Sequence, residues 1–169
     1  MDNCGNKWIA GHSGVLLILG DSEQMFLGQY EHNIDEKGRL TIPARYRELI
    51  AEGAYITRGF DKNLYVLTAA SFQHIYDQVN TTSLTSASSR SLRHFLFSNA
   101  EWVEVDKAGR ILIPQFLREI AHLDSNAFVV GAGTFFEIWS TEAWAEQNQR
   151  LNDADTNSDL YAAFDLSAA

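Results

Sequence analysis

The sequence predicts an α+β fold, mainly of β-strands, that is built from two similar halves. The chain has only two prolines, and both lie in nearly the same phrase. DEKGRLTIPARYRE spans Asp35–Glu48 and DKAGRILIPQFLRE spans Asp106–Glu119, and seven of the fourteen positions are identical. Random composition would give about one such match. Similar segments, Ala54–Phe72 and Ala127–Trp144, follow the two phrases, so we interpret the pattern as a duplication.

Each phrase predicts a hairpin whose turn contains a glycine. In the second copy, Trp102–Val105 leads into the turn, Lys107–Gly109 forms it, and Arg110–Ile113 leads out. Gly38 and Gly109 suit turn positions with positive φ, which glycine adopts without a steric penalty. Because the turn residues recur, we expect the same hairpin in both copies.

A short helix and a second hairpin are expected next in each copy. Pro43 and Pro114 fit the first residue of a helix, where a missing N–H costs nothing. Strands rich in β-branched and aromatic residues follow. They are Ala54–Thr57 with Leu64–Leu67, and Ala127–Val130 with Phe135–Trp139. An amphipathic helix is expected to end each copy.

The two copies divide the chain into five segments. These are an N-terminal extension (1–24) expected to be unordered or dispensable, a first domain (29–72), a helix and connector (73–100), a second domain (101–144) and an acidic C-terminal tail (145–169). The connector contains the Ser/Thr-rich stretch Asn80–Ser91, and Ser91–Phe97 after it is expected to be a helix with a basic side. The tail keeps apolar residues at helical spacing, namely Leu160, Tyr161, Phe164 and Leu166.

The composition indicates an ordinary globular protein of the reducing cytoplasm. The chain of 169 residues is 46% hydrophobic and 21% charged, which lies in the globular range. Its single cysteine, Cys4, excludes a disulfide framework and a cysteine-based zinc site. The longest apolar run, Val15–Leu19, is five residues and cannot span a bilayer. We expect neither a membrane anchor nor a signal peptide.

The formal net charge of −9 lowers the expectation of a nucleic-acid partner, but its distribution matters. The first 24 residues carry three acids and one base, and residues 151–169 carry four acids and no base. The region 25–150 therefore holds 15 acids against 12 bases, a net charge of only −3. DNA binding by this central region stays open.

The repeated phrase places an aspartate and an arginine four residues apart, as Asp35–Arg39 and as Asp106–Arg110. The aspartate can accept backbone N–H bonds and fix the turn, and the arginine begins the outgoing strand. An arginine fork can bind guanine or phosphate through two parallel hydrogen bonds. Alternatively, each pair is a turn-closing ion pair without a ligand. The other recurring or nearby bases are Lys37, Arg45, Arg47, Lys107 and Arg118.

From Met25 to about residue 150, the chain resembles the MraZ family of bacterial transcriptional regulators, built from tandem SpoVT/AbrB-type domains. The resemblance is carried by MFLG at Met25, by DEKGR and DKAGR, by RLTIP and RILIP, and by FEIW at Phe136–Trp139. It implies swapped-hairpin halves that form an intramolecular pseudo-dimer β-barrel with short helices. It also implies that the protein forms ring-like homo-oligomers and binds double-stranded DNA in the nucleoid. The expected binding sites are G-rich direct repeats upstream of division and cell-wall genes.

The resemblance carries the functional Asp–Arg pairs of the family over to Asp35, Arg39, Asp106 and Arg110, and the other candidates are chosen for their residue chemistry. The DNA-binding candidates are Arg39, Arg110, Lys37, Lys107, Arg45 and Arg47, and the turn-shaping candidates are Asp35, Gly38, Asp106 and Gly109. Arg47 and Arg118 could equally cap helix ends. We expect no cofactor, no metal and no small-molecule substrate.

Two other function classes compete with DNA binding. An enzyme is disfavoured because the five histidines are scattered and neither a G-x-S-x-G elbow nor a glycine-rich phosphate loop is present. An oligomeric protein–protein interaction module is the stronger alternative. Its interface would use aromatic residues, namely Trp102, Trp139, Trp144, Phe95, Phe97 and Tyr65. Salt separates the two, because phosphate contacts weaken steeply as salt rises and apolar contacts do not.

Overall fold

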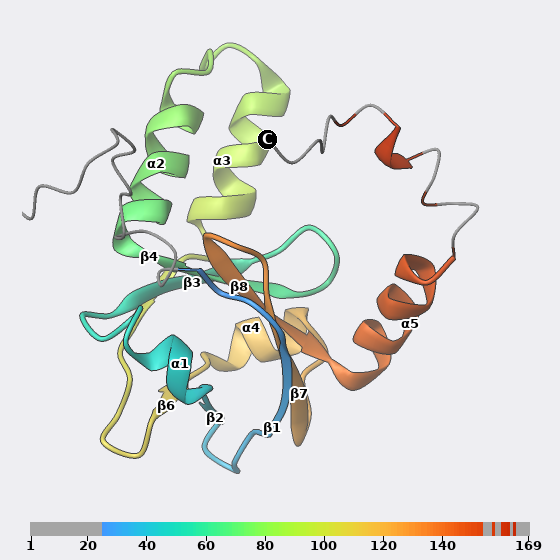
Figure 1. Cartoon of the computed structure of the whole chain (residues 1–169). Helices are drawn as coiled ribbons and strands as arrows, with labels where there is room; N and C mark the ends of the chain where they lie inside the picture. The colour runs from blue at the N-terminus through green and yellow to red at the C-terminus, as the bar shows by residue number, and fades with distance from the viewer. Residues whose placement is uncertain (1–24, 154–156, 158–159, 163, 165–169) are drawn as a thin grey trace, which may run out of the picture.

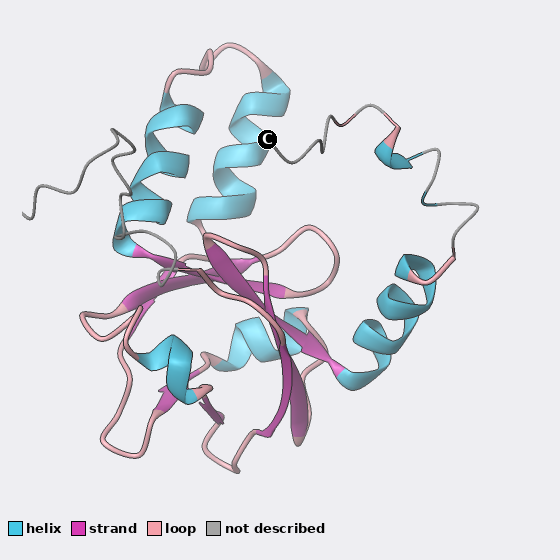
Figure 2. Cartoon of the chain, viewed as in Figure 1, coloured by secondary structure: helices cyan, strands magenta, loops and turns pink. Residues whose placement is uncertain are grey.

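The computed structural model describes residues 25–153, 157, 160–162 and 164. Their fold is α+β, with an antiparallel sheet in the strand order β1-β7-β8-β4-β3-β5 and a separate two-stranded ribbon, β2-β6 (Figures 1 and 2). The strands are β1 (Gln29–Asn33), β2 (Arg39–Thr41), β3 (Ala54–Arg58), β4 (Leu64–Thr68), β5 (Glu101–Val103), β6 (Arg110–Leu112), β7 (Asn126–Gly131) and β8 (Phe135–Ser140). The helices are α1 (Ala44–Arg47), α2 (Ala69–Asn80), α3 (Ala87–Phe97), α4 (Gln115–Ile120) and α5 (Thr141–Leu151). The predictions for residues 1–24 and for Leu166 in the acidic tail lie outside the described residues, whereas Leu160, Tyr161 and Phe164 of the tail are described and exposed.

The second predicted hairpin of each repeat is confirmed. β3 pairs with β4 in one repeat and β7 pairs with β8 in the other, both antiparallel. The two hairpins then join through β4 and β8, with Leu64 opposite Ile138 and Val66 opposite Phe136. All four of these side chains are buried. The two repeats therefore share one sheet and one core.

The first predicted hairpin of each repeat forms only at its turn. In the first repeat, a single bridge between Ile34 and Leu40 links the two arms, and then the arms diverge. β1 pairs with β7 of the second repeat, β5 pairs with β3 of the first, and β2 pairs with β6 across the repeats. Pairing between repeats covers more apolar surface than a local two-stranded hairpin, which is marginal in water. Each repeat therefore completes the other.

The described sheet is open, with β1 and β5 as its edge strands. Because neither edge pairs with the other or with the β2-β6 ribbon, the residues that the structure describes do not form the closed barrel expected from the family resemblance. The mainly β, α+β class is observed, together with strand pairing between the repeats.

The inner face of the ribbon joins the main core. Leu40 and Ile111, which face each other in the ribbon, are completely buried. Helices α1 and α4 follow the ribbon strands and add Tyr46 and Leu117 to the same core. The two prolines stand one residue earlier than predicted: they precede the helices with extended backbone, and the carbonyl of Pro43 accepts the first helical hydrogen bonds.

The helical connector lies at the end of the molecule away from the ribbon, where α2 and α3 pack side by side (Figure 1). Helix α3 begins at Ala87, four residues earlier than predicted, because the Ser86 hydroxyl caps it by accepting the Ser89 N–H. The Ser/Thr-rich stretch is thus only partly a connector. Thr57 on β3 anchors α3 to the sheet by donating to the Leu96 carbonyl at 2.6 Å.

Candidate nucleic-acid interface

The β2-β6 ribbon presents one polar face to solvent. In its register, Arg39 lies opposite Leu112 and Thr41 lies opposite Arg110. Because side chains alternate along a strand, these four lie on the face opposite to buried Leu40. Arg39 and Thr41 therefore face outward, as the alternation of polar and apolar residues in Arg39–Ile42 indicates. The ribbon brings the arginines of the two repeats, 71 residues apart in sequence, onto one surface.

The turn before β2 is built around the carboxylate of Asp35. Its Oδ1 accepts the backbone N–H groups of Lys37 at 3.0 Å and of Arg39 at 2.9 Å. Its Oδ2 accepts a hydrogen bond from Nε of Arg39 at 2.7 Å. Gly38 completes the turn with a φ of 81°, where a side chain would be strained. The aspartate thus fixes both the turn and the direction of the arginine.

The turn before β6 repeats this geometry. Asp106 Oδ1 accepts the backbone N–H groups of Ala108 and Arg110, both at 2.9 Å. Its Oδ2 lies 3.0 Å from Nε and 2.8 Å from Nη2 of Arg110. Arg110 also reaches the other turn, because its Nη1 lies 3.5 Å from Asp35 Oδ2. The two turns therefore form one connected cluster of charges.

The ion pair that closes the turn, which the alternative interpretation requires, is present in both copies. The two roles are compatible. The pKa of Asp35 is lowered, first by its hydrogen bond to the backbone N–H of Arg39, and the pKa of Asp106 is lowered, first by the side chain of Arg110. Among the described residues, neither Nη atom of Arg39 makes a hydrogen bond, and 32% of its side chain is exposed. The two Nη atoms of Arg39 are therefore free to donate hydrogen bonds to a ligand.

The remaining predicted DNA contacts differ in their exposure. Lys37 and Lys107 are exposed within the two turns, and Arg45 is exposed on α1, where its Nη1 lies 3.5 Å from the hydroxyl of Tyr30. The two turns lie at the end of the molecule opposite α2 and α3 (Figure 1). The three cations can meet an extended anion without rearrangement of the core.

Arg47 and Arg118 are less exposed than these three cations near the turns. Each is half-buried, and each donates its Nε to the carbonyl of the residue before the proline: Arg47 to Ile42 at 2.7 Å and Arg118 to Ile113 at 3.2 Å. These carbonyls precede the helices, so neither arginine caps the C-terminal end of its helix. The idea that they cap helix ends is wrong.

Sequence reasoning gave no site role to Leu112. Its side chain is 56% exposed on the outer face of the ribbon, beside the two turn arginines. The signal was present in the alignment of the two phrases, because Leu112 stands where the first copy has Thr41, on the outward register.

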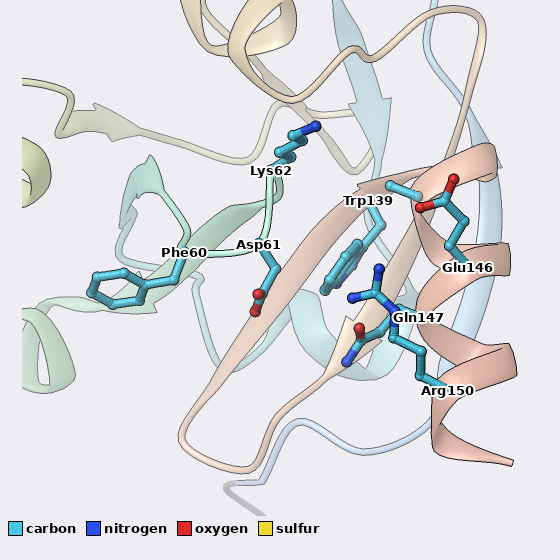
Figure 3. A pocket seen from close by; sticks show the side chains of 8 residues that line it. Phe60, Asp61, Lys62, Trp139, Glu146, Gln147 and Arg150 are labelled. Carbon is cyan, nitrogen blue, oxygen red and sulfur yellow. The ribbon is translucent and has the colours of Figure 1, made fainter. Parts of the chain in front are cut away.

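A cavity of about 270 Å³ lies elsewhere, between the β3–β4 loop and α5 (Figure 3). Its labelled lining residues are Phe60, Asp61, Lys62, Trp139, Glu146, Gln147 and Arg150. Both signs of charge occur there, and the residues of the two turns are not among the lining residues. In the described part of the chain, no cluster of histidine, cysteine or carboxylate side chains could hold a metal ion. No helix in that part is long and apolar enough to cross a membrane.

Comparison with known proteins identifies the two repeats. A family model described as "MraZ protein, putative antitoxin-like" matches the chain twice, at residues 25–95 and 96–166. The chain is 46% identical over 138 residues to the transcriptional regulator MraZ of Roseiflexus castenholzii, an alignment that covers 82% of this chain and 94% of the relative. It is 45% identical over 120 residues to the protein of that name from Herpetosiphon aurantiacus, covering 71% and 84% of the two chains. The chain belongs to the MraZ family.

Proposed function

We propose that this protein is a sequence-specific DNA-binding transcriptional regulator whose β2-β6 ribbon reads base edges in the major groove. The relatives are named transcriptional regulators, and we extend that role to this chain. The observation that carries the proposal is the outer face of the ribbon, where each repeat contributes one arginine beside a fixed turn.

A two-stranded antiparallel ribbon has the dimensions to enter the major groove. Arg39 and Arg110 are suited to guanine, whose O6 and N7 accept two parallel hydrogen bonds from a guanidinium. Asp35 holds only the Nε side of the Arg39 fork, so less side-chain freedom is lost when the terminal nitrogens of Arg39 bind. The terminal nitrogens of Arg110 are already paired with Asp106 and Asp35, so Arg110 has to exchange these partners to bind guanine. Leu112 adds an apolar surface of the kind that contacts the thymine methyl group.

The exposed cations near the ribbon supply the sequence-independent part of the binding. Lys37, Lys107 and Arg45 are suited to phosphates on either side of the groove. The overall charge of −9 opposes DNA at long range, but binding follows the local field, and most of the excess acid lies in the two terminal segments. We therefore expect binding that is weak at each ribbon and strongly dependent on salt.

Ring assembly on repeated sites is part of the proposal. Each chain has two similar but non-identical halves, which can meet neighbouring chains head to tail and close a ring. A ring of ribbons would bind several G-rich direct repeats at once, and the linked sites would raise the overall affinity. We infer that each pair of swapped hairpins acts as one pseudo-dimeric reading unit on DNA of the cytoplasmic nucleoid, upstream of division and cell-wall genes.

The experiment is a gel shift with the DNA upstream of the protein's own gene and unrelated DNA as competitor. Arg39→Ala should weaken specific binding about 5- to 150-fold per engaged site and relax base preference. Lys37→Ala should weaken all sequences alike and reduce the salt slope by about one unit. Arg90→Ala, which removes an exposed charge from α3, is the matched control and should change neither.

A folded Arg39→Ala/Arg110→Ala double variant that binds the upstream DNA at full affinity would refute the reading role of these residues. If the wild-type protein shows no preference for that DNA, the proposed function fails. If it instead binds a protein partner with an affinity insensitive to salt, the interaction-module alternative is favoured.

A further inference from the structure

The turns that carry Arg39 and Arg110, residues 35–39 and 106–110, are called the reading turns. Each reading turn is covered by an arginine from the opposite repeat. A Cβ atom built on Gly109 would lie only 2.3 Å from Cζ of Arg47, and one built on Gly38 would lie 2.7 Å from Cζ of Arg118. At such distances a side chain at either position would force the guanidinium of the arginine to move. The guanidinium groups therefore occupy the space that the two glycines leave empty.

Backbone hydrogen bonds join the same residues into a closed unit. The Ile42 N–H donates to the Gly109 carbonyl at 2.9 Å, while the Ile42 carbonyl accepts the Nε of Arg47 at 2.7 Å. Arg47 in turn lies against Gly109. The strand end of one repeat, its helix arginine and the glycine turn of the other repeat thus fix one another.

The same unit recurs with the repeats exchanged. The Ile113 N–H donates to the Gly38 carbonyl at 2.9 Å, the Ile113 carbonyl accepts the Nε of Arg118 at 3.2 Å, and Arg118 lies against Gly38. The contact is thus present in both repeats of the duplicated phrase. Both arginines are half-buried, so much of their surface is committed to this packing.

We propose that Arg47 and Arg118 are positioning residues that hold the reading turn of the opposite repeat, and that they are not phosphate contacts. Arg47 sets the turn that carries Arg110, and Arg118 sets the turn that carries Arg39. This proposal rests on the proposed DNA-reading function, because the purpose of holding each turn is to position its arginine for a base.

The chemistry of the contact requires arginine. A guanidinium is planar, so it can lie flat over a glycine while its Nε donates sideways to a carbonyl. A lysine keeps the positive charge but has neither the plane nor a donor at the Nε position. Lysine therefore separates the two roles: it preserves a phosphate contact and removes the positioning.

The first test measures amide hydrogen exchange in the full chain carrying Arg47→Lys or Arg118→Lys. Arg47→Lys should raise the exchange of the Ala108, Gly109 and Arg110 amides about two- to tenfold, the effect of losing one hydrogen bond. The amides of the other turn should change little. Arg118→Lys should give the reverse pattern, and Arg90→Lys on α3 should leave both turns unchanged.

Faster exchange in the turn of the same repeat, or unchanged exchange in both turns, would overturn the proposal. The two variants probe symmetric units, so one suffices if the other does not fold. The second test is the gel shift: Arg47→Lys should lose specific affinity as fully as Arg47→Ala does, and retention of affinity by the lysine variant would also overturn the proposal. If the wild-type protein binds no specific DNA but the crossed exchange pattern is present, the DNA-reading function fails and the positioning role stands.

Discussion

Substitution of Gly109 by alanine tests the contact between the repeats through stability alone. Gly109 has a φ of 78°, and an added methyl group would collide with the guanidinium of Arg47. Gly133 provides a matched control, because its φ is 82° and a Cβ there would meet nothing within 4 Å. The two substitutions therefore impose the same backbone strain, and only one of them displaces a neighbour.

The difference in the free energy of unfolding follows from these two terms. Alanine in the left-handed region costs about 1–2 kcal/mol, and this cost applies at both positions. Alanine also lowers the conformational entropy of the unfolded chain, which offsets part of this cost equally in both variants. At Gly109, displacement of Arg47 also removes its hydrogen bond to the Ile42 carbonyl, which contributes about 1 kcal/mol net. Gly109→Ala should therefore be less stable than Gly133→Ala by about 1 kcal/mol, or about 2–4 °C in Tm.

Urea unfolding followed by tryptophan fluorescence measures both variants, and a double-mutant cycle with Arg47→Ala isolates the contact. Without the guanidinium, Gly109→Ala should cost no more than Gly133→Ala. The expected coupling free energy is thus about 1 kcal/mol. Equal costs for the two glycine substitutions, together with a coupling within about 0.3 kcal/mol of zero, would refute the reasoning.

Three further predictions concern single groups. The pKa values of Asp35 and Asp106 are lowered in the folded protein, so the two carboxylates stabilise the fold at pH values above their ordinary pKa of 3.8. This stabilisation is lost as the pH falls through the folded-state pKa. The difference in stability between wild type and Asp35→Asn should therefore close below about pH 4, which urea unfolding at several pH values measures. Burial raises the pKa of Tyr46 to about 12, so Tyr46→Phe should remove a phenol that titrates near pH 12 in absorbance. The same substitution should cost about 1 kcal/mol, because it removes the hydrogen bond to the Leu27 carbonyl. Thr57→Val should cost about 1–3 kcal/mol in urea unfolding, because it leaves a buried carbonyl near the end of α3 without its donor.

Local periodicity was sufficient to predict the faces and turns of the ribbon. The alternation around Leu40 indicates which side chains point inward, and Gly38 indicates a turn with positive φ; both are observed. The second hairpins were also predictable, because their strands are near neighbours in the chain and rich in β-branched residues. These features depend on contacts within about 15 residues of each other.

The pairing between repeats could not be predicted from residue patterns alone. Each ribbon strand has three residues, and its alternation is satisfied equally by a local partner or a distant one. The contact of Arg47 with Gly109 spans 62 positions in the chain and has no local signal. A recurring arginine on a short helix fits a helix cap, a phosphate contact or packing, and only the three-dimensional arrangement distinguishes them.

The contacts between each glycine turn and the arginine of the opposite repeat explain why two otherwise divergent copies share particular residues. Of the seven identical positions in the two phrases, five take part in the turns or in the contacts between them: the aspartate that fixes the turn, the glycine under the guanidinium, the arginine paired with the aspartate, the isoleucine that bonds to the other turn and the helix arginine. The sixth, the proline, precedes the helix that carries this arginine. Nothing in the structure explains the seventh, Glu48 with Glu119. Because the glycine of one copy contacts the arginine of the other, a change in either copy disturbs its opposite turn. The two halves are therefore constrained as a pair, and an isolated half should not form a reading turn.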